Sequence, residues 1–96
     1  MYESKLHDED MDALFKAVLS LETEEDCYRF FEDLCTISEL QAMSQRFAVA
    51  RLLRKGETYT VIAERTGAST ATISRVNRCL VYGAAGYRGV LDKLGE

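Results

Sequence analysis

The 96-residue chain contains no proline, and no alternation of apolar and polar residues is long enough to predict a strand. Proline interrupts helices, and a period of two residues marks a half-buried strand. The apolar residues make up 47% of the chain and follow helical spacing instead. The sequence therefore predicts an all-α fold, with residues 1–96 as a single domain because so short a chain rarely divides into two.

The chain is also poor in the residues that build catalytic and metal sites. It has one histidine, His7, and three cysteines, Cys27, Cys35 and Cys79, without a Cys-x-x-Cys pair. Zinc sites and disulfide frameworks need paired spacings, and catalysis needs several converging groups. We therefore expect no enzymatic activity, no catalytic residue, no metal and no resident cofactor. The cysteines are expected to be small, mostly buried residues.

No run of residues approaches the roughly 18 consecutive apolar residues that span a membrane. The N-terminal stretch MYESKLHDEDMD is too acidic for a secretory signal. These two absences predict a cytoplasmic protein without a membrane partner.

The net charge of −4 is distributed unevenly. Residues 1–35 contain eleven acids and three bases, whereas residues 36–96 contain nine bases and five acids. Between residues 46 and 78 alone there are seven bases and two acids. Binding to phosphates needs a local positive field rather than a basic whole protein. Charge alone leaves two interpretations of this segment equally open, a solvated helical face or a surface for nucleic acid.

Apolar periodicity predicts three helices in the first half of the chain. They lie over about residues 8–21, 23–36 and 38–56. The first carries four apolar side chains spaced three and four apart, namely Met11, Leu14, Phe15 and Val18. The faces of the first two helices are broader than a single small core requires. We therefore expect residues 1–56 to be N-terminal dimerisation helices.

The stretch ETYTVIAERTGASTATISRVNRCLVYG has the pattern of a helix-turn-helix, predicted over residues 58–82. Two short helices joined by a tight turn need a turn glycine, a small residue at the crossing and branched apolar residues on the buried faces. Gly67 supplies the turn because its φ can be positive, and Ala63 is the small residue. The apolar positions are Ile62, Ala68, Ile73 and Val76. A C-terminal helix is predicted over residues 84–96.

The second helix of this motif has an exposed face that favours DNA. A surface helix without a partner commonly carries Glu and Lys pairs, but no acid occurs between residues 68 and 83. Hydroxyl and methyl groups can approach bases closely, and arginine pairs with guanine or phosphate. The predicted DNA-binding residues on this helix are Ser69, Thr70, Ala71, Thr72, Ser74, Arg75 and Arg78. An ordinary helix pair in a bundle explains the apolar positions but not this face.

Four further residues flank the start of the motif and are predicted to contact the DNA backbone. The first helix of a helix-turn-helix crosses the phosphates, so basic and hydroxyl side chains near its start can bind them. These residues are Arg54, Lys55, Thr58 and Tyr59.

The stretch from TISELQAMSQR through GASTATISRVNRCL resembles the Trp-repressor superfamily, most closely its YerC/YecD-type branch. The resemblance covers nearly the whole chain. It implies a six-helix fold and an intertwined homodimer with two reading heads on successive major grooves of double-stranded DNA. The implied function is that of a bacterial transcriptional regulator, a repressor that binds a palindromic operator.

The resemblance also implies a ligand pocket. In tryptophan-binding members two arginines hold the corepressor, and Arg46 and Arg75 resemble them by position, Arg46 across a one-residue gap. Thr36 resembles the threonine that closes the pocket. Val76 stands where those repressors have glycine and would crowd an indole ring, and Cys79 replaces a serine. The sequence therefore argues against tryptophan as the corepressor, and it leaves open whether another small molecule binds.

Two other classes of protein match parts of this sequence. A non-catalytic interaction module would dock its helix pair on the transcription machinery, but the basic, hydroxyl-rich helix favours DNA over protein. The DNA-binding fragment of a transposase or recombinase would belong with a set of catalytic carboxylates, and no such set can be identified in the sequence.

Overall fold

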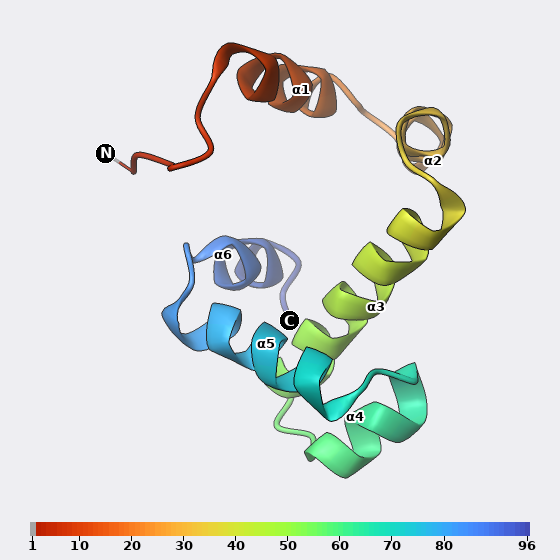
Figure 1. Cartoon of the computed structure of the whole chain (residues 1–96), viewed down its shortest axis with the longest axis vertical. Helices are drawn as coiled ribbons and strands as arrows, with labels where there is room; N and C mark the ends of the chain where they lie inside the picture. Colours follow the sequence, from red (N-terminus) through yellow and green to blue (C-terminus); the bar gives the residue numbers. More distant parts are fainter. Residues whose placement is uncertain (1) are drawn as a thin grey trace. The chain divides into compact units, whose positions relative to one another are not determined.

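The computed structural model describes residues 2–96, which form six helices and no strand (Figure 1). The helices are α1 (Glu9–Leu19), α2 (Glu24–Leu34), α3 (Ile37–Arg54), α4 (Tyr59–Thr66), α5 (Thr70–Tyr82) and α6 (Gly86–Lys93). The prediction of a six-helix, all-α chain is confirmed. None of the helices in this described part is long and apolar enough to cross a membrane.

The chain divides into two compact units, the first ending at Ile37 and the second running from Ser38 to Glu96. Nearly all of α3 therefore belongs to the same unit as α4, α5 and α6. The two helices ahead of it, α1 and α2, make up the first unit with the N-terminal segment.

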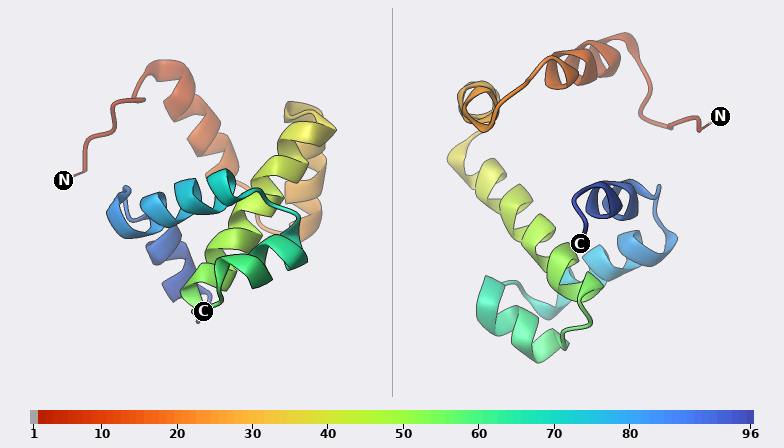
Figure 2. Two further views of the ribbon diagram at one scale, coloured as in Figure 1. Left: turned by 60° about the horizontal axis from the view of Figure 1, so that its bottom comes forward. Right: turned by 180° about the vertical axis from the view of Figure 1, so that it is seen from behind.

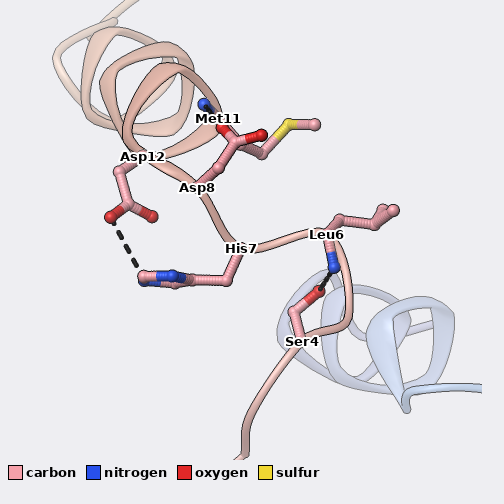
Figure 3. Close-up of polar contacts among 6 residues, drawn as sticks. All are labelled: Ser4, Leu6, His7, Asp8, Met11 and Asp12. Carbon is pink, nitrogen blue, oxygen red and sulfur yellow. Dashed lines mark hydrogen bonds and ion pairs between the residues drawn. The ribbon is translucent and has the colours of Figure 1, made fainter.

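Side-chain caps determine where the helices of the first unit begin. The Asp8 carboxylate accepts a hydrogen bond from the Met11 amide at 2.7 Å, and the His7 ring lies 3.2 Å from the Asp12 carboxylate (Figure 3). Thr23 and Asp26 form a capping box at the start of α2. Such caps satisfy the free amides of a first turn, and acidic side chains there suit the helix dipole.

Neither α1 nor α2 buries a single side chain. Large apolar residues remain exposed on both helices, namely Phe15, Leu19, Tyr28 and Leu34. Helices of 11 residues are marginally stable alone in water, and packing of an apolar face supplies most of the stability of such helices in proteins. These two helices therefore require an apolar surface to cover them.

The core lies in the second unit, where α5 crosses α3 and α4 lies beside both (Figures 1 and 2). Its cluster of buried residues draws on all three helices and the turn between α4 and α5: Val49, Ala50, Ile62, Ala68, Ile73 and Val76. Leu91 of α6 is also fully buried. The apolar positions predicted for the helix-turn-helix thus form most of this core.

Two ion pairs join the end of α3 to the C-terminal segment. Arg51 Nε lies 2.6 Å from Glu96 Oε1, and Arg54 pairs with Asp92 of α6. The hydrogen bond from Arg51 is the main reason that the pKa of the Glu96 carboxyl is lowered from its ordinary value. Exposed pairs of this kind contribute little stability, but they give the cations carboxylate partners.

The expectation that the cysteines are mostly buried is wrong. Cys27 and Cys79 are exposed and Cys35 is partly exposed. Cys27 belongs to the unit whose helices bury no side chain, and Cys79 lines an open hollow described below.

Candidate DNA interface

The first helix of the interface, α4, is defined by a cap at each end. At its start the Thr58 hydroxyl accepts a hydrogen bond from the Val61 amide at 3.3 Å. At its end Gly67 adopts the left-handed conformation with φ of 72°, and its amide donates to the Ala63 carbonyl at 2.9 Å. This is the conformation expected of a turn glycine, and it directs the chain sharply from α4 toward α5.

Thr66 and Ala68 order the turn on either side of Gly67. The Thr66 hydroxyl donates to the Ile62 carbonyl at 2.7 Å and accepts from the Ala68 amide at 3.1 Å. The Ala68 side chain is only 5% exposed and belongs to the core. The turn is therefore anchored both by hydrogen bonds and by apolar packing.

We expect Gly67→Ala to destabilise the protein by about 1–2 kcal/mol, the usual cost of left-handed backbone at a residue with a Cβ. The added Cβ would meet nothing closer than Gln45 Nε2 at 4.0 Å, so the cost is conformational rather than steric. Thermal unfolding measures it, and Gly67→Asn should cost less. Gly89→Ala is the matched control, because Gly89 lies within α6 with open space around it and alanine favours helix. Equal melting temperatures for Gly67→Ala and the unmodified protein would contradict the role of this turn.

The second helix, α5, begins at Ser69, which serves as its cap. The Ser69 hydroxyl accepts from the Thr72 amide and donates to the Thr72 hydroxyl, both at 3.1 Å. Two of the predicted DNA-binding hydroxyls thus have structural partners at the start of α5. Both lie on the first turn, where a helix entering the major groove presents its reading residues.

The remaining predicted residues of α5 form one exposed surface, which we call the α5 face: Thr70, Ala71, Ser74, Arg75 and Arg78. Within residues 2–96 neither arginine has an ion-pair partner, and the Thr70 and Ser74 hydroxyls make no hydrogen bond. The α5 face therefore presents two cations and two hydroxyls that are available to a ligand.

The flanking residues differ from one another in their availability. Lys55 and Tyr59 are exposed, and Lys55 has no ion pair in the described part of the chain. Thr58 caps α4, and Arg54 pairs with Asp92. Arg54 would have to exchange this carboxylate for a phosphate in order to contact DNA.

The residues predicted for a ligand pocket lie in different environments. Thr36 directly precedes α3, and Arg46 and Arg75 are exposed. Val76 is 2% exposed and forms part of the core. Cys79 is the one predicted pocket residue that lines an open hollow of about 500 Å³ in the second unit. The other lining residues are Phe47, Gly83, Ala84, Gly86, Tyr87 and Val90.

Sequence reasoning missed Gln45 of α3. Its side-chain amide Nε2 donates to the Thr66 carbonyl at 3.1 Å, which links α3 to the turn of the helix-turn-helix. A signal was present, because Gln45 lies four residues before the buried Val49 and so shares its face of α3. Within residues 2–96 no group of three or more His, Cys, Asp or Glu side chains is placed to hold a metal ion.

Comparison with known proteins yields one family and several relatives. The family model described as Trp repressor protein matches residues 9–95. The uncharacterized protein YerC of Bacillus subtilis (strain 168) is 55% identical over 96 residues, covering 100% of this chain and 92% of YerC. A crystal structure of a TrpR like protein from Eubacterium eligens ATCC 27750 has a TM-score of 0.92 and 56% identity, over 95% of this chain and 94% of that one. A candidate Trp repressor from Staphylococcus aureus has a TM-score of 0.91 and 49% identity, over 95% and 91% of the two chains.

Proposed function

Because the chain belongs to the Trp repressor family, we propose that it is a DNA-binding transcriptional regulator of bacteria, and specifically a repressor. It acts in the cytoplasm as a homodimer on a palindromic operator, with no catalytic activity and no membrane partner. In each subunit α5 enters the major groove of double-stranded DNA.

The observation that carries this proposal is the α5 face. Its two arginines have no ion-pair partner within the described residues, and small hydroxyl and methyl groups lie beside them. We assign base contacts to Ser69, to the small groups of the α5 face and to the arginines, and phosphate contacts to Thr72 and the flanking residues. The flanking residues are Arg54, Lys55, Thr58 and Tyr59.

Uncovered apolar surface supports the homodimer. α1 and α2 bury no side chain, and the second unit has a hollow lined largely by apolar residues. A second copy whose N-terminal helices interlock with those of the first would cover such surfaces. The two-fold symmetry of a dimer that reads two half-sites is matched by a palindromic site.

We propose that tryptophan is not the effector, because Val76 stands where tryptophan-binding repressors have glycine, and its branched side chain is 2% exposed and packed in the core. The chain contains no tryptophan, so added tryptophan can be followed by its own fluorescence polarisation. We expect no saturable change up to millimolar concentration and no gain in DNA affinity. Saturable binding together with tighter DNA binding would contradict this proposal. Arg46, Arg75 and Cys79 would then be assigned to a tryptophan pocket.

Selection of DNA from a random pool with the purified protein tests the proposed function. We expect a palindromic consensus with half-site centres about one helical turn apart, and affinity that falls steeply as salt rises. Light scattering of the complex should give two chains for each duplex. Failure to enrich any sequence would instead favour an interaction module that acts on the transcription machinery.

A further inference from the structure

Gln45 makes a contact between α3 and the turn of the helix-turn-helix that spans 21 residues of sequence. Its amide Nε2 donates to the Thr66 carbonyl at 3.1 Å in a partly buried setting. The same nitrogen is the nearest group to the position that a Cβ on Gly67 would occupy, at 4.0 Å. The side chain of Gln45 therefore lies directly against the turn.

The acceptor in this contact is one that the helix itself leaves free. Thr66 is the last residue of α4, and the last four carbonyls of a helix have no partner within it. The Thr66 hydroxyl makes its hydrogen bonds within the turn, with Ile62 and Ala68. The Thr66 carbonyl is therefore the acceptor that remains for a donor on a neighbouring helix. A carbonyl accepts only from a donor, which is why the amide nitrogen of Gln45 must face it.

Apolar packing of α4 and α5 against α3 restricts their crossing angles only to within about 15–20°. The core at this crossing consists of aliphatic side chains and alanine, which attract without directional preference. A hydrogen bond is directional, and this one joins α3 to the point where the chain turns from α4 into α5. It can therefore set the angle at which the α5 face is presented.

We infer that Gln45 is a positioning residue that fixes the orientation of the DNA-reading helix and thereby sets the tolerance for half-site spacing. This inference rests on the proposed function, since the spacing of two half-sites is meaningful only for a dimer that binds a palindrome. Gln45 itself is assigned no contact with DNA.

The test compares Gln45→Met, which keeps the length of the side chain and removes the donor, with Gln41→Met. Gln41 lies one turn earlier on α3, is exposed and has no hydrogen bond among the described residues. Binding is measured to the selected operator, to operators lengthened or shortened by one base pair between the half-sites, and to unrelated DNA. We expect Gln45→Met to bind the operator about fivefold to tenfold more weakly, the usual range for one lost hydrogen bond, and to discriminate less between spacings. Its affinity for unrelated DNA should stay within about twofold, because the phosphate contacts are unchanged.

A second variant pair tests the donor requirement. Gln45→Glu places a carboxylate against the Thr66 carbonyl and should weaken operator binding further, whereas Gln41→Glu adds the same charge without this contact. Equal losses for the two Glu variants would mean that charge rather than positioning is responsible. Unchanged spacing discrimination in Gln45→Met, or a parallel loss of operator and unrelated DNA with a lower melting temperature, would overturn the inference.

Amide hydrogen exchange tests whether the hydrogen bond from Gln45 to Thr66 orders the turn, even if the protein selects no DNA sequence. We expect the Ala68 amide, which donates to the Thr66 hydroxyl, to exchange faster in Gln45→Met than in Gln41→Met. The Ile73 amide, which donates to the Ser69 carbonyl within α5, serves as the internal reference. Identical exchange at Ala68 in both variants would show that Gln45 does not order the turn. A wild-type protein that fails to enrich DNA contradicts the proposed function separately.

Discussion

Replacing both Arg75 and Arg78 with alanine is expected to weaken operator binding by about 2–6 kcal/mol, which is thirtyfold or more. An arginine that reaches a base or phosphate typically contributes about 1–3 kcal/mol, and these two are exposed on α5. Neither has an ion pair in the described residues, so DNA does not have to displace a carboxylate. A gel-shift titration at several salt concentrations measures the loss. Because both arginines are assigned to bases, the slope of log affinity against log salt should change little.

The control for this experiment removes the same charge elsewhere. Arg88 and Lys93 of α6 are exposed and have no ion pair in the described part of the chain. Replacing both with alanine lowers the net charge equally and should change operator affinity by less than about 1 kcal/mol, as for surface charges without a direct contact. Similar losses in the two double variants would show that DNA responds to overall charge and not to the α5 face.

The parts of the fold that the sequence predicted well are those that depend on local chemistry. Gly67 was identified because a sharp turn requires positive φ, and the structure has φ of 72° there. Ile62, Ala68, Ile73 and Val76 were identified from helical spacing, and all four are buried. Each of these features follows from residues fewer than about 15 positions apart, the range over which periodicity is informative.

The contacts that sequence reasoning missed join residues far apart in the chain. Arg54 was predicted to bind phosphate, and its pairing with Asp92, 38 residues later, was not anticipated. Gln45 and Thr66 are separated by 21 residues, and only the packing of α3 against the turn brings them together. Helical spacing places Gln45 on the same face of α3 as Val49, but no sequence period reveals which distant residue the side chain of Gln45 or Arg54 meets. The predicted roles of the α5 face residues remain predictions that the proposed experiments address.

Ile73→Ala is expected to destabilise the protein by about 2–5 kcal/mol, because it removes buried methyl groups and leaves a cavity. Ile73 is fully buried in the cluster that α3, α4 and α5 share. Thermal or urea unfolding measures this loss. Val81→Ala is the control on the same helix, since Val81 is 49% exposed and should lose less than about 1 kcal/mol. A loss from Ile73→Ala no larger than that from Val81→Ala would contradict the assigned core.

The same variant separates stability from recognition. Ile73 lies between Thr72 and Ser74, so one helix carries both the core and the predicted reading face. Because its side chain points into the core, Ile73→Ala should weaken DNA binding only by lowering the folded fraction. Well below its melting temperature, operator affinity should therefore return to within about threefold of the unmodified protein, whereas the Arg75 and Arg78 double variant stays weak at every temperature. A persistent loss in fully folded Ile73→Ala would show that core packing also sets the angle of α5, a role that we assign to Gln45.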